Sequence, residues 1–231
     1  MEKRLIVYGD IHGCLDEFKL LRKKIKPTKN DIEVIVGDFL NKGLYSTEVI
    51  KYIQKNHIFS VMGNNEARLL KYRKKGKQEY SRNFDKIMKK LTEKDFEFLE
   101  KLPYFLKFKN ITIVHGGIPV GLKLDHKLTK EQKREITLLR YYDKDMNSLS
   151  WKEKDKIYKY WSELYDGSDG FVVYGHQPFK KPREDRFAVG IDTGCVYGGS
   201  LTAVIFKLKK DGYDTKNYTF VSVKAKKKYF T

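Results

Sequence analysis

The chain has 231 residues, of which 40% are hydrophobic and 34% charged, and its formal net charge is +18. This composition predicts a soluble globular domain and excludes a membrane protein, because no apolar run is long enough to cross a bilayer. Only Cys14 and Cys195 are present, so the sequence implies no disulfide framework and no cage of thiolate metal ligands, and we expect a cytoplasmic protein.

The first part of the chain alternates strands and helices. Apolar strands are predicted at 5–8, 34–36 and 58–62, and amphipathic helices between them at 14–24 and 47–56. This alternation predicts a parallel sheet with right-handed crossovers.

The second part of the chain is predicted to be more varied. In chain order we expect helices at 66–75 and 83–102, a hairpin at 104–108 and 111–114, two helical segments between 129 and 165, and strands at 171–174, 187–191, 201–208 and 218–223. The helical segments form an expected insertion at about 125–168. No repeat or linker interrupts the pattern, so we expect one domain over 1–231.

Five of the apolar strands end in a side chain that can bind a metal ion, and parallel strands place their ligands at this edge of a sheet. Asp10 and His12 follow the first strand, and the other candidates are Asp38, Asn64, His115 and His176. Oxygen and imidazole donors suit Mn²⁺, Fe²⁺, Zn²⁺ or Co²⁺. Six donors exceed what one structural zinc needs, so two ions sharing a bridging carboxylate fit better, and Asp38 is our choice for the bridge.

The motifs around these residues resemble a known family. Gly9-Asp10-Ile11-His12-Gly13, Gly37-Asp38, Gly63-Asn64, His115-Gly116 and Gly175-His176 resemble, in order and spacing, the five blocks of the calcineurin-like metallophosphoesterase superfamily. The stretch 190–202 is similar to that of bacterial diadenosine tetraphosphatases and bacteriophage-type protein phosphatases. The resemblance covers about 5–206 and implies an α/β (α+β) fold, a two-sheet β-sandwich flanked by helices.

The resemblance also implies roles for individual residues. Asp10 and His12 would hold one metal ion, Asp38 would bridge, and Asn64, His115 and His176 would hold the second. Mn²⁺ is our first choice for both ions, with Fe, Zn, Co or Ni as alternatives. Arg140 falls near the place of a phosphate-binding arginine, and Lys42 and Asn64 are further candidates for binding the substrate phosphate.

The chain departs from the family at three positions. Asn41, Lys42 and Asn65 stand where related phosphatases carry an Asp, an Arg and a His. In the family that His is the general acid and the Asp orients it. An amide cannot protonate a leaving group, and general acid catalysis contributes roughly 10²–10⁴-fold. We therefore expect poor cleavage of alkyl phosphates, and we place Asn41 and Asn65 with Asp38 in the expected catalytic centre.

These observations predict a metal-dependent phosphohydrolase that acts on a phosphorylated small molecule or nucleotide, such as a dinucleoside polyphosphate. One alternative is a protein phosphatase that acts on a phosphoprotein. A second alternative is a degenerate member that binds metal and a phosphorylated or nucleic-acid partner through its basic surface. Most of the lysines are dispersed, and the densest cluster is the tail at 224–228.

Overall fold

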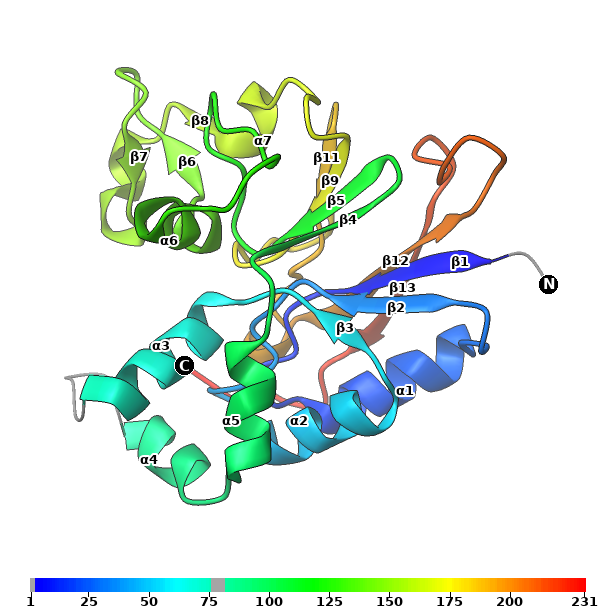
Figure 1. Cartoon of the computed structure of the whole chain (residues 1–231), viewed down its shortest axis with the longest axis vertical. Coiled ribbons are helices and arrows are strands. Elements are labelled where there is room, and N and C mark those ends of the chain that lie inside the picture. The colour runs from blue at the N-terminus through cyan, green and yellow to red at the C-terminus, as the bar shows by residue number, and fades with distance from the viewer. Residues whose placement is uncertain (1–2, 76–81) are drawn as a thin grey trace.

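The computed structural model describes residues 3–75 and 82–231. These residues form two five-stranded sheets and one small three-stranded sheet. In Figure 1 the two larger sheets occupy the middle of the molecule, with helices α1 and α2 below and the segment carrying α6 and α7 above. The prediction of a two-sheet fold of mixed α/β class flanked by helices is confirmed.

The first sheet has the strand order β13-β12-β1-β2-β3. Strands β1, β2 and β3 run parallel, as the alternating pattern predicts, and β12 pairs with the other side of β1 in the antiparallel direction. The strands of this sheet are β1 (Arg4–Tyr8), β2 (Ile32–Ile35), β3 (Phe59–Ser60), β12 (Ser200–Lys207) and β13 (Thr219–Lys224).

The second sheet has the strand order β10-β11-β9-β5-β4. Strands β5, β9 and β11 are parallel, whereas the edge strands β4 and β10 are antiparallel to their neighbours. The strands are β4 (Phe105–Phe108), β5 (Ile111–Val114), β9 (Phe171–Tyr174), β10 (Arg183–Asp185) and β11 (Ala188–Gly190).

Strand β1 is buried on both faces. Leu5 and Val7 belong to the apolar core between the two sheets, whereas Ile6 and Tyr8 belong to the core between the first sheet and the helices. Alternate side chains of a strand point to opposite faces, so a strand at this position needs apolar residues throughout. This explains the unbroken apolar run before Asp10.

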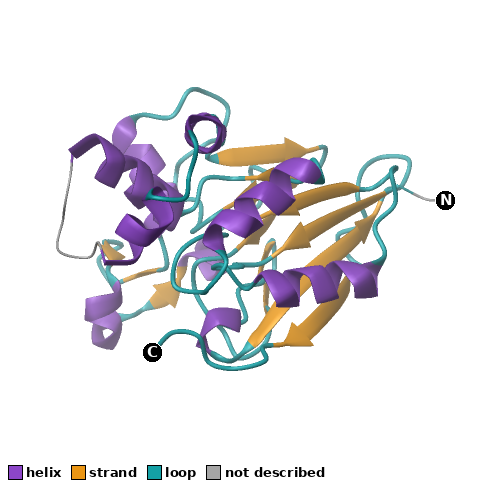
Figure 2. Cartoon of the chain, turned by 90° about the horizontal axis from the view of Figure 1, so that it is seen from below, coloured by secondary structure: helices purple, strands orange, loops and turns teal. Residues whose placement is uncertain are grey.

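Helices cover the outer face of the first sheet and extend to one side of it, as Figure 2 shows from below. Their bounds are α1 (Leu15–Ile25), α2 (Ser46–Lys55), α3 (Asn64–Lys75), α4 (Arg82–Met88) and α5 (Glu93–Glu100). None of the helices in 3–75 and 82–231 has the length and apolar character that a membrane crossing requires.

The prediction of one helix over 83–102 was wrong, because α4 and α5 are separate. The chain turns at 89–92, and Thr92 then caps α5: its hydroxyl accepts a hydrogen bond from the Asp95 N–H, and the Asp95 carboxylate accepts one from the Thr92 N–H. This reciprocal capping satisfies two backbone donors and fixes a new helix start.

The segment 125–168 packs above the second sheet and is called the cap below. Its first helix is α6 (Lys130–Leu138), whereas the second predicted helical segment contains only two short helical pieces separated by a strand. The remainder is β6 (Tyr141–Tyr142), β7 (Ser148–Leu149), the 3₁₀ helix η1 (Trp151–Lys156), β8 (Lys159–Tyr160) and the four-residue α7 (Trp161–Leu164). Aromatic residues favour strands, and tyrosines fill most of β6 and β8.

Candidate metal centre

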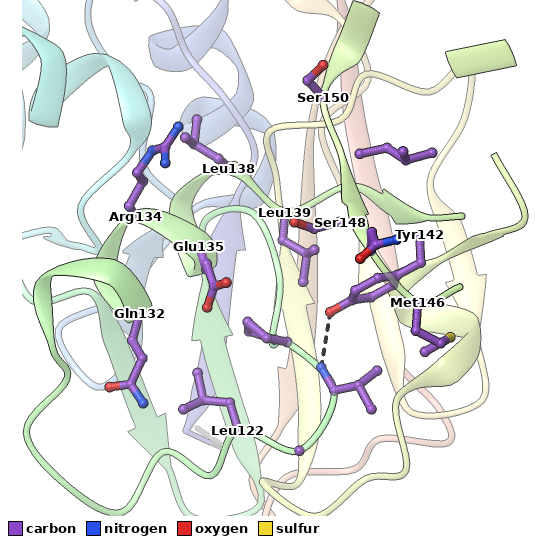
Figure 3. Close-up of a pocket in the computed structure, with 15 residues that line it drawn as sticks. Leu122, Gln132, Arg134, Glu135, Leu138, Leu139, Tyr142, Met146, Ser148 and Ser150 are labelled. Carbon is purple, nitrogen blue, oxygen red and sulfur yellow. Dashed lines mark hydrogen bonds between the residues drawn. The ribbon is translucent and has the colours of Figure 1, made fainter. Parts of the chain in front are cut away.

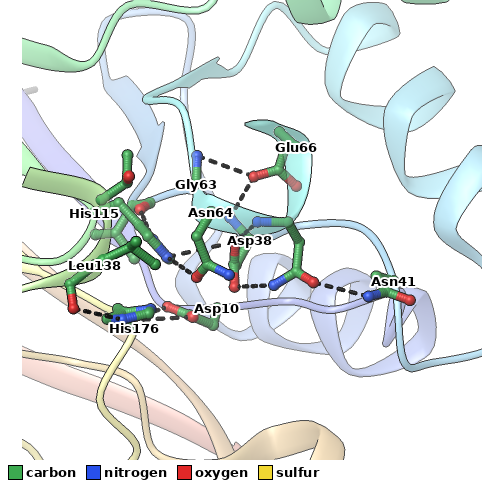
Figure 4. A network of polar contacts seen from close by, with 12 residues as sticks. Asp10, Asp38, Asn41, Gly63, Asn64, Glu66, His115, Leu138 and His176 are labelled. Carbon is green, nitrogen blue, oxygen red and sulfur yellow. Dashed lines mark hydrogen bonds and ion pairs between the residues drawn. The ribbon is translucent and has the colours of Figure 1, made fainter. Parts of the chain in front are cut away.

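Six polar side chains meet where parallel strands of both sheets end. They follow β1, β2 and β3 of the first sheet and β5 and β9 of the second, and they are Asp10, His12, Asp38, Asn64, His115 and His176. All six are buried. Figure 4 shows five of them, with Asp38 at the middle of the network. The structure therefore brings together every residue that the sequence suggested as a metal ligand.

Asp38 has one carboxylate oxygen toward each half of this cluster. Its Oδ2 lies 3.6 Å from Nε2 of His12, and its Oδ1 lies 3.4 Å from Nε2 of His115. The cluster contains two groups whose donor atoms lie within 4.8 Å of one another: Asp10 with His12 and Asp38, and Asp38 with His115 and His176. A carboxylate shared between two such groups is the arrangement that a pair of metal ions requires.

Each histidine of the cluster has one ring nitrogen at a backbone carbonyl. Nδ1 of His12 lies 3.2 Å from the Leu40 oxygen, Nδ1 of His115 lies 2.8 Å from the Val36 oxygen, and Nε2 of His176 lies 3.2 Å from the Leu138 oxygen. A neutral ring donates its proton to such a carbonyl, so the other nitrogen keeps a lone pair. Histidines that bind metal ions are held in this way.

The ionisation of these groups suits a cation. Burial lowers the pKa of His12 to about 3 and lowers those of His115 and His176, so all three rings are neutral at pH 7. Burial works against ionisation of Asp38, but His115, His12 and Lys42 outweigh it and lower its pKa to about 2. Burial, Asp192 and Asp38 raise the pKa of Asp10 well above its ordinary value. Buried carboxyl groups in such proximity are stabilised by a bound cation.

Three of the six candidate ligands have a left-handed backbone. The φ angle is +46° at His12, +49° at Asp38 and +66° at His176, and the nearby Asn41 and Lys42 also have positive φ. Such conformations cost about 1–3 kcal/mol for residues other than glycine and are concentrated at functional sites. Here the left-handed conformations let the backbone turn sharply after each of these strands and direct the ligand side chain into the cluster.

Two glycines make room for the carboxylates. A Cβ atom at Gly63 would lie 2.4 Å from Oδ1 of Asp38, and one at Gly175 would lie 2.1 Å from Oδ1 of Asp10. Both distances are shorter than any ordinary contact. The glycines that precede Asn64 and His176 in the sequence motifs are therefore needed for close approach to the acids.

Asn65 and Asn41 are hydrogen-bonded to each other beside this cluster. The Asn41 side-chain nitrogen donates to Oδ1 of Asn65 at 2.8 Å, and the Asn65 side chain in turn donates to Asp38 Oδ2. The backbone N–H of Asn65 also donates to Asp38 Oδ1 at 2.8 Å. Asn65 thus holds Asp38 in place, and it carries no proton that can be transferred to a leaving group.

The two candidate phosphate-binding cations contact different histidines of the cluster. Nζ of Lys42 is 2.9 Å from Nε2 of His12 and 5.1 Å from the centre of the Tyr197 ring. Arg140 lies between α6 and β6, and its side chain donates to the His176 carbonyl at 2.9 Å and to the Gln177 side chain at 2.8 Å. The structure therefore places Lys42 at the half of the cluster that contains His12, and Arg140 at the half that contains His176.

Two acidic residues that the sequence analysis missed support the site. Glu66 accepts hydrogen bonds from the backbone N–H groups of Asp38, Gly63 and Leu40 at 2.8, 3.0 and 3.2 Å. Asp192, whose pKa burial raises to about 6, is a major cause of the raised pKa of Asp10. Glu66 lies two residues after the Gly63-Asn64 motif and Asp192 lies in the stretch 190–202, so an acidic residue in or beside a motif was the available signal.

A cavity of about 1030 Å³ lies between α6 and the β6–β7 turn of the cap and the chain at 119–122 (Figure 3). Its charged lining residues are Arg134 and Glu135, and the Tyr142 hydroxyl accepts a hydrogen bond from the Val120 N–H on its wall. Leu138 connects the two regions, because it lines the cavity while its carbonyl contacts His176. The six clustered ligands are not among the lining residues.

The arrangement of two sheets with a buried cluster of Asp, His and Asn side chains is that of a metal-dependent phosphoesterase. The sequence model of the calcineurin-like phosphoesterase family matches residues 3–215, so the chain belongs to this family and is a metal-dependent phosphohydrolase.

Relatives and solved structures support a more particular likeness. The chain is 29% identical to a protein named bis(5'-nucleosyl)-tetraphosphatase PrpE [asymmetrical] from Oceanobacillus iheyensis, over 90% of each chain. It is 28% identical to the protein of the same name from Bacillus subtilis, over 87% of this chain and 89% of that one. A crystal structure described as a candidate diadenosine tetraphosphatase has a TM-score of 0.78 and 27% identity, covering 96% of this chain and 93% of that chain. A protein serine/threonine phosphatase from Saccharomyces cerevisiae shares the fold, with a TM-score of 0.65 and 15% identity over 98% of this chain and 81% of that chain.

Proposed function

We propose that the protein hydrolyses dinucleoside polyphosphates, such as diadenosine tetraphosphate, with two divalent metal ions. The names of its relatives support a nucleotide substrate. The pairing of two donor groups through Asp38 supports a dinuclear centre. A cytoplasmic location and a single domain over the whole chain stay predictions from the sequence.

In this proposal the first ion is held by Asp10, His12 and Asp38. The second is held by Asp38 together with Asn64, His115 and His176. The fit rests on the donor chemistry: neutral imidazoles with a lone pair toward the cluster, an ionised shared carboxylate and an amide oxygen, Oδ1 of Asn64, that lies 3.0 Å from Nε2 of His115. Such donors suit Mn²⁺ first, and Fe, Zn, Co or Ni as alternatives.

When bound, the two ions supply an activated water for in-line attack and neutralise charge on the phosphoryl oxygens. The chain's own residues position the substrate. Lys42 and Arg140 bring positive charge to the two sides of the cluster, and Asn64 faces it with its amide. Lys42 gives one ammonium where related phosphatases have a forked guanidinium, so it attracts a phosphate but orients it less strictly.

The observation that carries the choice of substrate is the Asn41–Asn65 pair. Its hydrogen bonds leave no acidic proton at the place of the family's general acid. An alkoxide leaving group needs that proton, whereas a nucleoside polyphosphate leaves as a stable anion. The site therefore favours the anhydride bond of a dinucleoside polyphosphate over the ester bond of phosphoserine.

A substrate comparison with added Mn²⁺ tests the proposal. We expect turnover of diadenosine tetraphosphate and of p-nitrophenyl phosphate, and loss of both with Asp38→Asn. Asp16→Asn is a matched control, because Asp16 is an acid on α1 with a 45% exposed side chain that forms an ion pair with Lys226. Faster turnover of a phosphoserine peptide than of diadenosine tetraphosphate would identify a protein phosphatase instead. No turnover of any of these compounds would point to a metal- and phosphate-binding protein.

A further inference from the structure

The fold brings the two cysteines of the chain together beside the metal centre. Cys14 directly precedes α1 and lies two residues after His12, whereas Cys195 begins the 3₁₀ helix η2 (Cys195–Tyr197) that follows Asp192 and Gly194. The donor atoms of Cys14, Glu17 and Cys195 all lie within 4.8 Å of one another. Each of these side chains is buried, with 1% of the residue exposed. We call these three residues the thiol cluster.

The two carboxylate oxygens of Glu17 have different surroundings. Oε1 accepts a hydrogen bond from the Lys226 N–H at 3.0 Å and one from the Tyr229 hydroxyl at 2.7 Å. Oε2 is buried and has no hydrogen-bond partner within the part of the chain that the structure describes. A buried carboxylate oxygen without a partner is costly, so its place beside two sulfurs needs an explanation.

We propose that the thiol cluster binds one thiophilic divalent cation, such as Zn²⁺, through the sulfurs of Cys14 and Cys195 and the free oxygen of Glu17. The sulfurs and oxygen of a tetrahedral zinc site lie about 3.6–3.8 Å apart, given Zn–S bonds near 2.3 Å and Zn–O bonds near 2.1 Å. The observed separations, all below 4.8 Å, allow this with small side-chain movements. Three protein ligands leave the fourth position for a water molecule.

The exchange of protons for the cation is balanced in charge. One Zn²⁺ replaces the two thiol protons, which pass to solvent, and the carboxylate keeps its charge. Two neutral thiols with one carboxylate carry a net charge of about −1, and so do two thiolates, one carboxylate and Zn²⁺. The cation thus gives the unpaired Glu17 oxygen a partner without adding net charge to a buried place.

A disulfide between Cys14 and Cys195 explains the cluster less well. It would use both sulfurs but leave Oε2 of Glu17 without a partner. The cluster also differs in chemistry from the catalytic centre, whose donors are oxygens and imidazole nitrogens. Thiolates are soft ligands and prefer a different metal ion from the one that oxygen and imidazole donors prefer, so the two sites would be filled independently.

The proposed ion would join three segments of the chain. Besides the turn after β1 and the turn at η2, the C-terminal segment 225–230 lies against this cluster. Glu17 holds Lys226 and Tyr229, and the Tyr229 N–H donates to the Val196 carbonyl at 2.9 Å. An ion here would tie the turn that carries His12 to the end of the chain, so we assign it a structural role.

The test uses the reduced full-length protein and Co²⁺ or Cd²⁺ as the probe, because thiolates bound to these ions give a charge-transfer absorption band. The catalytic centre contains no sulfur, so this band reports the thiol cluster alone. We expect a band that saturates near one equivalent. It should be lost in Cys195→Ser, shifted to at least tenfold higher probe concentration in Glu17→Gln, and retained in Asp38→Asn, which impairs the catalytic centre.

Several results would overturn the proposal. The wild-type protein would show no band although both thiols are titratable after unfolding, or the band would persist unchanged in Cys195→Ser. Absence of titratable thiols in the unfolded, unreduced protein, with no metal released, would identify a disulfide instead. Circular dichroism and thermal melting check that each variant folds. If Cys195→Ser does not fold, the shift in Glu17→Gln decides, and an unshifted titration there contradicts the proposal.

Discussion

Restoring the family's acid pair gives the sharpest perturbation of this site. The double variant Asn65→His with Asn41→Asp puts an imidazole and a carboxylate where two amides now meet. The side-chain nitrogen of Asn41 lies 2.8 Å from Oδ1 of Asn65, so the new groups would stand at hydrogen-bond distance. Oδ1 of Asn41 is buried and has no hydrogen-bond partner among residues 3–75 and 82–231, so a carboxylate oxygen there would gain a donor from the ring.

The size of the expected effect follows from the missing step. General acid catalysis contributes roughly 10²–10⁴-fold, which corresponds to about 2.7–5.4 kcal/mol of transition-state stabilisation. The double variant should therefore raise kcat/KM for an alkyl phosphate such as phosphoserine by about 10²-fold or more. The variant also loses the hydrogen bond from the Asn65 side chain to Asp38, so we expect a loss of about 1–3 kcal/mol in unfolding free energy.

The assay compares phosphoserine with p-nitrophenyl phosphate for the wild type, each single variant and the double variant, at saturating Mn²⁺. Only the alkyl substrate should gain, because the aryl leaving group needs little protonation. The single variants serve as controls, since neither alone forms the pair. A folded, metal-loaded double variant whose phosphoserine turnover rises by less than tenfold would refute the reasoning.

Three further perturbations test other parts of the site and fold. Tyr197 is 38% exposed, and its ring lies 6.2 Å from that of Phe230 and 5.1 Å from Nζ of Lys42. Because stacking on a base is worth about 1–3 kcal/mol, Tyr197→Ala should raise KM for diadenosine tetraphosphate about 5–150-fold and leave KM for p-nitrophenyl phosphate unchanged. Equal losses for both substrates would exclude a base contact. Lys42→Arg should lower KM for p-nitrophenyl phosphate, because a guanidinium binds phosphate with two hydrogen bonds, whereas Lys42→Ala should raise this KM. A KM that is the same in both variants would argue against phosphate binding by residue 42. Although burial raises the pKa of Asp31, hydrogen bonds from Arg4 and Thr28 outweigh this effect and lower it. Asp31→Asn should therefore unfold at a lower urea concentration than the wild type at pH 7, and this difference should shrink as the pH falls below about 3.9. A difference that is constant with pH would contradict a stabilising role for the ion pair between Arg4 and Asp31.

The positions of the candidate ligands were predictable because each follows a strand with an unmistakable apolar pattern. His115 comes directly after β5, whereas Asp10 and Asp38 come two and three residues after β1 and β2, and glycine motifs mark the turns. The expectation that two sheets contribute to one cluster came from the family resemblance, because strand patterns do not specify which strands pair. Parallel neighbours such as β5 and β9 are separated by about 55 residues, which no local signal connects.

Other features depend on contacts between distant segments. Glu66 accepts a hydrogen bond from the Asp38 N–H, 28 residues earlier in the chain. Cys14 and Cys195 lie close together although most of the chain separates them in sequence. The cap was the weakest prediction, because its short strands β6, β7 and β8 are stabilised by each other and not by a long periodic pattern.

We propose that this metal site lacks a proton donor for the leaving group, and the dependence of the rate on the leaving group distinguishes a site with such a donor from one without it. The measurement is kcat/KM of the wild-type protein with Mn²⁺ for diadenosine tetraphosphate and for a series of phosphate esters, from p-nitrophenyl through phenyl to alkyl, plotted against the pKa of the leaving group. We predict a steep fall along the ester series, with alkyl esters at least about 10²-fold slower than p-nitrophenyl phosphate and with diadenosine tetraphosphate cleaved efficiently. A flat dependence, with alkyl esters cleaved as fast as the aryl esters and the dinucleotide, would contradict it.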